Sequence, residues 1–126
     1  MADNAFSQSC RLLTASDYKT VFDKSQLKVS NRYFLVLATT NSLPTPRVGL
    51  VIAKKSVGKA VHRNRIKRLI RQSFRTQKST LNNLDLVVLA RKDADKLENQ
   101  AIVEQLNQLW QDLAKKLARM SSTAKH

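Results

Sequence analysis

The most constraining feature of this sequence is a long basic segment without carboxylates. From Lys54 to Arg75 it reads KKSVGKAVHRNRIKRLIRQSFR, with nine Lys or Arg residues and no Asp or Glu. From Ala60 onward, its apolar residues recur at the spacing of a helix that lies on a core. They are Val61, Ile66, Leu69, Ile70 and Phe74. The pattern predicts a helix from about Lys59 to about Lys78, with one side buried.

The other side of this predicted helix is positively charged. Arg63, Lys67 and Arg71 are spaced four apart, Arg75 prolongs their row, and Arg65 and Arg68 flank it. Like charges at this spacing repel by a few tenths of a kcal/mol per pair, and no acidic neighbour relieves the repulsion. We infer that a polyanion neutralises the row. The alternative is a solvated face that only keeps the protein soluble, although such surfaces usually mix both signs of charge.

The segment that leads into this helix supports an anion site. Gly58 is expected to make a tight entry with positive φ. That turn would place Lys54, Lys55 and Lys59 beside the helix N-terminus, where free backbone N–H groups favour anions.

Composition indicates a single polyanion-binding domain over residues 1–126. The chain has 23 Lys and Arg against 9 Asp and Glu, a net charge of +14, which favours nucleic acid or an anionic membrane surface. No acidic residue lies between Lys24 and Leu84, a span that holds 14 basic residues. The single cysteine, Cys10, excludes an internal disulfide and suits the cytoplasm. We expect neither a secretory signal nor a membrane span.

The order of periodic segments predicts an α+β fold, a small mixed sheet with helices packed on it. A capped helix is expected from Thr14 to Asp23, with Tyr18, Val21 and Phe22 on one side, and a short extended piece before Asn31. The other expected elements are a strand over 32–40, a strand over 47–54, the basic helix, a strand over 84–90 and a helix over 99–120. Residues 1–10 and 121–126 are expected to be disordered tails.

Three details of this order can be tested in the structure. The strand over 47–54 should run antiparallel to the strand over 32–40 across a short loop, and Gly49 within it indicates a bulge or a close backbone approach. The strand over 84–90 is almost continuously apolar, so it should be interior and parallel to one neighbour in a βαβ unit. Trp110 should anchor the packing of the last helix.

Groups for catalysis are scarce. His62 and His126 are the only histidines, and the chain has no Gly-rich phosphate loop or Cys cluster. We expect His62 to contact phosphate or water, the alternative being a stand-alone nuclease with His62 as its base. Composition therefore favours a binder of RNA or DNA, and a general RNA-binding or ribosomal structural protein fits it equally well.

The segment from Arg47 to Arg75 resembles the bacterial ribonuclease P protein subunit family. It has the Arg-Val-Gly-Leu strand of that family, the Lys54-Lys55 pair followed by a glycine, and the Arg-Asn-Arg helix at residues 63–65. The resemblance extends from about Arg11 to about Leu117. It implies a ribosomal-protein-like α/β sandwich with a mainly antiparallel sheet and a left-handed βαβ crossover, whereas the general rule for such units is right-handed.

This resemblance implies a protein that assists a catalytic RNA. The holoenzyme removes the 5′ leader of precursor tRNA, and the RNA subunit with its Mg²⁺ performs the hydrolysis. We therefore expect no catalytic residue, cofactor or metal on this chain, no activity of the isolated protein, no membrane contact and no stable protein partner. A general RNA-binding protein would differ in failing to stimulate cleavage.

Two sets of residues carry over from the family motifs. The contacts to the catalytic RNA would come from Arg63, Asn64, Arg65, Lys67, Arg68 and Arg71. The cleft for the precursor-tRNA leader would be lined or bordered by Tyr18, Phe22, Phe34, Lys54 and Lys55. Leu37 stands where some members of the family carry a cleft tyrosine, so one family contact to the leader is expected to be missing from the second set.

Overall fold

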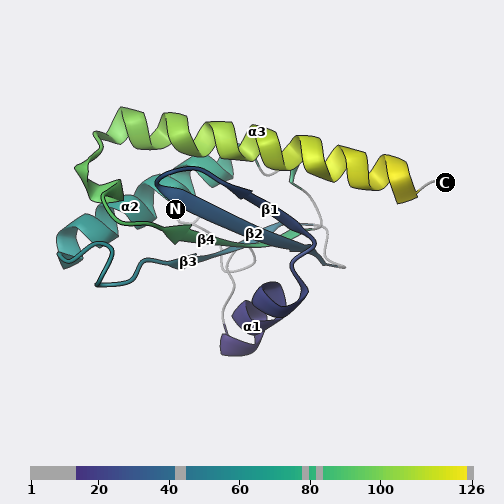
Figure 1. Cartoon of the computed structure of the whole chain (residues 1–126), viewed down its shortest axis with the longest axis horizontal. Coiled ribbons are helices and arrows are strands. Elements are labelled where there is room, and N and C mark those ends of the chain that lie inside the picture. The colour runs from purple at the N-terminus through teal and green to yellow at the C-terminus, as the bar shows by residue number, and fades with distance from the viewer. Residues whose placement is uncertain (1–13, 42–44, 78–79, 82–83, 125–126) are drawn as a thin grey trace, which may run out of the picture.

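A four-stranded sheet with helices on both faces forms the framework of the protein (Figure 1). The computed structural model describes residues 14–41, 45–77, 80–81 and 84–124. The elements in chain order are α1 (Ala15–Lys24), β1 (Leu27–Ser30), β2 (Phe34–Thr40), β3 (Arg47–Val51), α2 (Ala60–Arg75), β4 (Leu84–Ala90), η4 (Ala94–Lys96) and α3 (Asn99–Ala124). The predicted α+β class is confirmed. The predicted tail 1–10 lies outside the described residues, while α3 continues as a helix beyond its predicted end at Met120.

The strand order is β1-β2-β4-β3. β4 pairs antiparallel with β2 and parallel with β3, so the predicted parallel neighbour of the apolar strand is confirmed. β3 does run opposite to β2, but the two are not neighbours, because β4 lies between them. The chain passes from β3 through α2 to β4, and this βαβ unit is what fixes α2 against the sheet.

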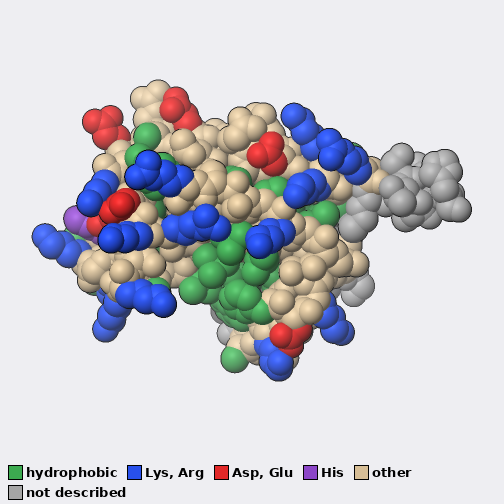
Figure 2. Space-filling model, viewed as in Figure 1, with side chains coloured by type: hydrophobic (Ala, Val, Ile, Leu, Met, Phe, Trp, Pro, Cys, Tyr) green, Lys and Arg blue, Asp and Glu red, His purple; other side chains and the backbone are tan. Residues whose placement is uncertain are grey.

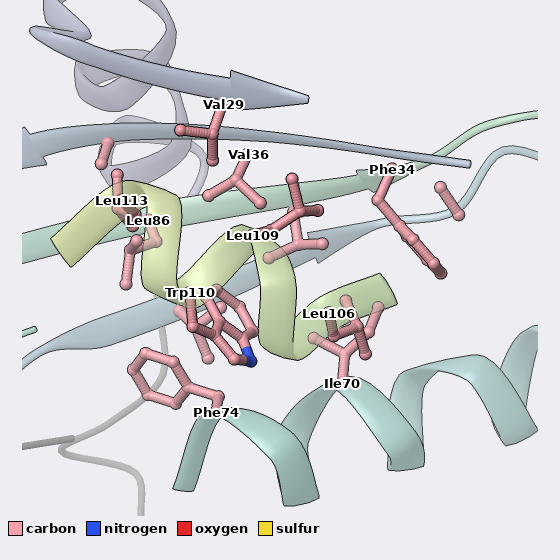
Figure 3. Packing of buried hydrophobic residues seen from close by; sticks show 14 of the residues in the cluster. Val29, Phe34, Val36, Ile70, Phe74, Leu86, Leu106, Leu109, Trp110 and Leu113 are labelled. Atoms are coloured by element: carbon pink, nitrogen blue, oxygen red, sulfur yellow. The ribbon is translucent and has the colours of Figure 1, made fainter. Parts of the chain in front are cut away.

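One face of the sheet is closed by α2 and α3. Phe34, Val36 and Ala38 of β2 point to this face, and Trp110 and Phe74 from the two helices meet over it with ring centroids 5.9 Å apart (Figure 3). The Trp110 indole N–H donates to Ser73 Oγ over 2.7 Å, so the one polar atom of this buried ring is satisfied. The prediction that Trp110 anchors the last helix is confirmed.

The opposite face carries only α1. Its N-terminus has the predicted capping box, in which Asp17 N donates to Thr14 Oγ1 and Thr14 N donates to Asp17 Oδ2. Val21 of α1 is buried against Val87 of β4, and Leu37, Val51 and Leu89 are only partly covered beside this pair. Because α1 has 10 residues, it cannot cover the whole face.

Gly49 explains how α1 approaches the sheet so closely. A Cβ atom at this position would lie 2.6 Å from the Tyr18 ring, which therefore rests directly on the strand backbone. Leu50 N donates to the Tyr18 hydroxyl oxygen over 3.2 Å. The close backbone approach predicted for Gly49 is confirmed. In the part of the chain that the structure describes, no helix is long and apolar enough to cross a membrane.

Candidate RNA interface

The basic helix α2 packs as predicted, apart from its first turn. Ile66, Leu69, Ile70 and Phe74 are buried against the sheet and α3, whereas Val61 is 68% exposed. Placing Val61 on the apolar side was wrong, because Val61 lies in the first turn of a helix that begins at Ala60, and its side chain points to solvent. The rest of the apolar side fixes which residues of α2 face away from the core.

Arg65 is partly buried and is bonded within the protein. Its guanidinium donates to Asn99 Oδ1 over 2.6 Å and to the carbonyl oxygens of Asp95 and Leu97 over 2.9 and 3.1 Å. Asp95 and Leu97 belong to the segment that joins β4 to α3, and Asn99 is the first residue of α3. Arg65 thus ties α2 to the start of α3, and its contact to RNA, which the resemblance implied, stays a prediction.

His62 also contacts this segment. Its Nδ1 lies 3.0 Å from Asp95 Oδ2, while 39% of the side chain stays exposed, so the expected contact with phosphate or water stays a prediction. The absence of acidic residues in the sequence of the helix did not predict this pair, because Asp95 reaches α2 only through the fold. The stand-alone nuclease with His62 as its base stays an alternative, which cleavage assays of the RNA-free protein decide.

Arg63 folds back over the entry to α2. Its Nη1 donates to the carbonyl oxygens of Val57 and Gly58, over 3.0 and 2.9 Å. Among the described residues no glycine has positive φ, so the predicted role of Gly58 was wrong. The entry turn is instead closed by bonds from the backbone N–H groups of Ser56 and Val57 to Ala53 O, and it is anchored by the fully buried Val57 side chain.

This turn displays Lys54 and Lys55, which are both exposed between the end of β3 and the start of α2. On α2 itself, Asn64 and Arg68 are exposed and Lys67 is half-buried. In the described parts of the chain, these five side chains have no hydrogen-bond or ion-pair partner. Arg71 and Arg75, by contrast, both have intramolecular interactions. Four free cations of α2 and of its entry turn, together with the exposed amide of Asn64, form an outward surface, which we call the α2 surface: Lys54, Lys55, Asn64, Lys67 and Arg68.

A second candidate surface is the part of the sheet that α1 leaves uncovered. We call it the open face, and it consists of Leu35, Leu37, Val51 and Leu89, with Phe22 of α1 at its border. Phe22 is 44% exposed, an unusual position for a phenylalanine in the described chain. Figure 2 shows apolar side chains gathered over the sheet next to α1, below a row of Lys and Arg. An exposed apolar patch of this kind indicates a binding site.

Phe34 is not part of this surface. It is 0% exposed and lies in the core on the opposite face, so its assignment to the leader cleft was wrong. Side chains alternate along a strand, and Phe34 has the same parity as Val36 and Ala38, which both face α3. The residues of β2 that do reach the open face are Leu35 and Leu37. The alternation already distinguished them from Phe34, although the assignment of site residues did not use it.

One end of the open face is electrically neutralised. Arg47 of β3 donates from Nε and Nη2 to the two carboxylate oxygens of Asp85, over 2.9 and 2.6 Å. The Asn41 side-chain amide adds a bond of 2.6 Å to Asp85 Oδ1. The hydrogen bonds that Arg47 donates to Asp85 raise the pKa of Arg47 above its usual value. Arg47 belongs to the acid-free part of the sequence, but the fold supplies its carboxylate, so it does not contribute a free cation.

No group of three or more His, Cys, Asp or Glu residues in the described chain is arranged to hold a metal ion. The two surfaces therefore offer cations, amides and apolar side chains, which suit binding to RNA backbones and bases.

Comparisons with known proteins agree with this geometry. The family model for ribonuclease P matches residues 6–114. The ribonuclease P protein component of Chromohalobacter salexigens is 46% identical over 121 residues, covering 96% of this chain and 94% of the relative. That of Pseudomonas aeruginosa is 46% identical over 124 residues, covering 98% and 92%.

Solved structures give the same result. The RNase P protein of Staphylococcus aureus superposes with a TM-score of 0.75 at 32% identity, covering 81% of this chain and 93% of that one. The RNase P protein of Thermotoga maritima superposes with a TM-score of 0.69 at 32% identity, covering 80% and 96%. From the matched segment, the identities and the shared fold, the chain belongs to the ribonuclease P protein family.

Proposed function

We propose that this chain binds two RNAs through its two surfaces, the catalytic RNA of ribonuclease P through the α2 surface and the 5′ leader of precursor tRNA through the open face. Membership of the family makes the chain the protein subunit of ribonuclease P, with a role in processing tRNA 5′ ends, and associates it with the RNA of that enzyme. The observation that carries the finer proposal is the presence of an outward cationic helix surface and of an uncovered apolar face, which adjoin at Lys54 and Lys55.

The α2 surface suits a folded RNA because its cations are unpaired in the free protein. Lys67 and Arg68 lie on α2, and Lys54 and Lys55 lie on its entry turn, so neutralising phosphates breaks no intramolecular ion pair among them. Each neutralised phosphate releases counterions and adds roughly 0.7 to 0.9 to the slope of log affinity against log salt. Asn64 adds an amide that can bond to phosphate, sugar or a base edge.

The open face suits a single strand. Base stacking on an aromatic side chain contributes about 1 to 3 kcal/mol per base, and Phe22 is the exposed aromatic that borders the face. Lys54 and Lys55 follow Val51 closely in the chain, so they border the same face at its β3 end. Mature tRNA lacks a leader, so each 1.4 kcal/mol of leader binding favours precursor over product about tenfold.

In this proposal the protein supplies no reacting group. The RNA subunit, with its Mg²⁺, performs the hydrolysis, and the protein lowers the repulsion between two polyanions and positions the leader.

The test is reconstitution of the full chain with its cognate catalytic RNA at low Mg²⁺, scoring 5′ leader removal from a precursor tRNA. We expect the protein to stimulate cleavage and to show no cleavage alone. Binding without stimulation would identify a general RNA-binding protein, and cleavage by the RNA-free protein would identify a nuclease.

Substitutions separate the two surfaces. Phe22→Ala should weaken binding to precursor tRNA about tenfold and leave binding to mature tRNA unchanged. Equal losses for both tRNAs would mean that Phe22 only packs. Arg68→Gln should lower the salt slope for the catalytic RNA by roughly 0.7 to 0.9 without a change in stability.

Arg65→Gln is the matched comparison for Arg68→Gln, since each removes one positive charge from α2. It should lower the free energy of unfolding by about 1 to 2 kcal/mol, because it removes the fork of bonds to the start of α3. If Arg68→Gln destabilised the protein and Arg65→Gln altered only the salt slope, the assignment of the α2 surface would be wrong.

A further inference from the structure

A basic groove lies outside both surfaces, between β1 and the C-terminal part of α3. It is an open hollow of about 420 Å³, lined by Lys28, Val29, Ser30, Asp112, Lys115, Lys116 and Arg119. Its four cationic residues are all exposed. The single carboxylate, Asp112, already accepts a bond of 3.1 Å from the Gln108 amide. Figure 2 shows Lys and Arg side chains gathered along this part of α3. The groove therefore has the charge to bind an anion.

Lys28 connects this groove to the open face. It is paired with Leu37 in the β1–β2 register, so its side chain leaves the sheet on the same face as Leu37. Its carbonyl oxygen accepts a bond of 2.7 Å from Lys116 Nζ of α3. One residue thus belongs to the border of the open face and to the wall of the groove.

The order of the strands places cations at both ends of a path across the open face. Lys54 and Lys55 lie beyond β3, at one edge of the sheet, and β1 with Lys28 is the opposite edge. Three strand spacings separate these edges, roughly 14 Å. A single strand that crosses this distance over Val51, Leu89 and Leu37 would leave the sheet at Lys28 and enter the groove.

From this continuity we propose that the groove binds the phosphate backbone of leader nucleotides upstream of those on the open face. The inference rests on the proposed leader contact and extends it to long leaders. The catalytic RNA is the less favoured occupant, because α2 contacts α3 and η4, whereas the groove lies where α3 meets β1, the edge strand opposite to β3.

The proposal predicts an effect that depends on leader length. Lys115 and Arg119 can each neutralise one phosphate, and two such contacts to a single strand add roughly 1.4 to the salt slope. A precursor with a leader of about 16 nucleotides should show this steeper salt dependence, and a precursor with a leader of about 4 nucleotides should not. Near 0.1 M salt the long leader should bind roughly tenfold more tightly for this reason.

The experiment measures the affinity of the reconstituted holoenzyme for both precursors and for mature tRNA over a range of salt concentrations. Lys115→Gln with Arg119→Gln should abolish the advantage of the long leader and leave the short-leader precursor unchanged. Lys116 is kept, because its bond to the Lys28 carbonyl is part of the fold. Lys115→Arg with Arg119→Lys should retain the advantage, since it keeps both charges.

A matched control removes two charges elsewhere. Lys19 and Lys96 each form an exposed ion pair, with Asp23 and Asp93, and lie outside the groove. Lys19→Gln with Lys96→Gln should therefore leave the dependence on leader length intact. Loss of affinity for the long leader in this control would mean that net charge, not the groove, is responsible, and the proposal would fail.

Two other results would overturn the proposal. An equal loss for both precursors would assign the groove to the body of the tRNA, and weaker binding of the catalytic RNA alone would assign it to that RNA. The proposed leader contact is judged separately in the same titrations, by whether the short-leader precursor still binds more tightly than mature tRNA.

Discussion

The two faces of the sheet are built in opposite ways. On the face toward α2 and α3, every second residue of β2 and β4 is buried in one continuous core that includes Trp110 and Phe74. On the face toward α1, only Val21 and Val87 are fully buried within the smaller cluster, and Leu37, Val51 and Leu89 are partly exposed. The same strands supply both faces, so the difference comes from what covers them.

This contrast assigns stability to the face toward α2 and α3, the closed face, and RNA binding to the open face. Burial of apolar surface contributes about 25 cal/mol per Å², so most of the stabilisation comes from the face with two long helices. The open face keeps apolar area available for a ligand. Substitutions on the closed face should therefore change unfolding first, and those on the open face should change RNA binding first.

The largest effect is expected at the centre of the closed face. Trp110→Ala removes a fully buried ring and leaves the Ser73 hydroxyl without its donor, so the free energy of unfolding should fall by about 4 kcal/mol. Denaturant unfolding measures this. Trp110→Phe keeps most of the volume and should lose less. A loss below about 1 kcal/mol for Trp110→Ala would contradict the contrast between the faces.

The next-largest loss of stability is expected at the ion pair of Arg47 with the buried Asp85, on the face toward α1. Asp85→Ala would leave the Arg47 guanidinium without its bidentate partner and should cost about 2 to 3 kcal/mol, below the range for fully buried pairs because Arg47 is partly exposed. Replacing both residues, as Arg47→Met with Asp85→Leu, should recover most of this loss. If the double variant were no more stable than Asp85→Ala, the pairing would not be the cause.

Adjacent residues of β2 give the sharpest comparison between the faces. Val36 is fully buried on the closed face, and Leu37 is half-buried on the open face. Val36→Ala should cost about 2 kcal/mol in unfolding without selective loss of precursor binding. Leu37→Ala should lower the free energy of unfolding by about 1 kcal/mol and weaken the binding of precursor tRNA more than that of mature tRNA. The same profile for both variants would remove the functional distinction between the faces.

The smallest effect is expected where α1 meets the sheet. Gly49→Ala places a methyl group within 2.6 Å of the Tyr18 ring, which must move. Because the end of a side chain can shift, the loss of stability should be about 1 kcal/mol, with a change in precursor affinity as α1 moves. In a Tyr18→Ala background the same substitution should cost almost nothing. If Gly49→Ala lost the same stability in that background, the cause would be the strand backbone and not the Tyr18 ring.

Local patterns predicted the elements of the fold well. The capping box at Thr14, the alternation of β2 and the continuous apolar run of β4 all depend on neighbouring residues, which the sequence displays. The position of β4 between β2 and β3 depends on long-range pairing, and the expected hairpin-like relation of β2 and β3 missed it. Phe34 was misplaced because a role carried over from the family overrode the parity of its own strand.

The site was harder to predict because charge along the chain is not charge in space. Asp85 and Asp95 come from outside the acid-free span, yet the fold brings them to Arg47 and His62. Backbone carbonyl groups, which leave no trace in composition, occupy Arg63 and Arg65. The free cations of α2 are therefore a subset of those that helical spacing suggested.

The bond from Lys116 to the carbonyl of Lys28 has a consequence for the protein before it meets RNA. β1 is an edge strand of only four residues, and an unpaired edge invites strand addition from a second copy. The ammonium group occupies an acceptor that an incoming strand would need, and the charge beside it repels an equally basic neighbour. The same side chain that shapes the groove thus discourages self-association of a newly made subunit.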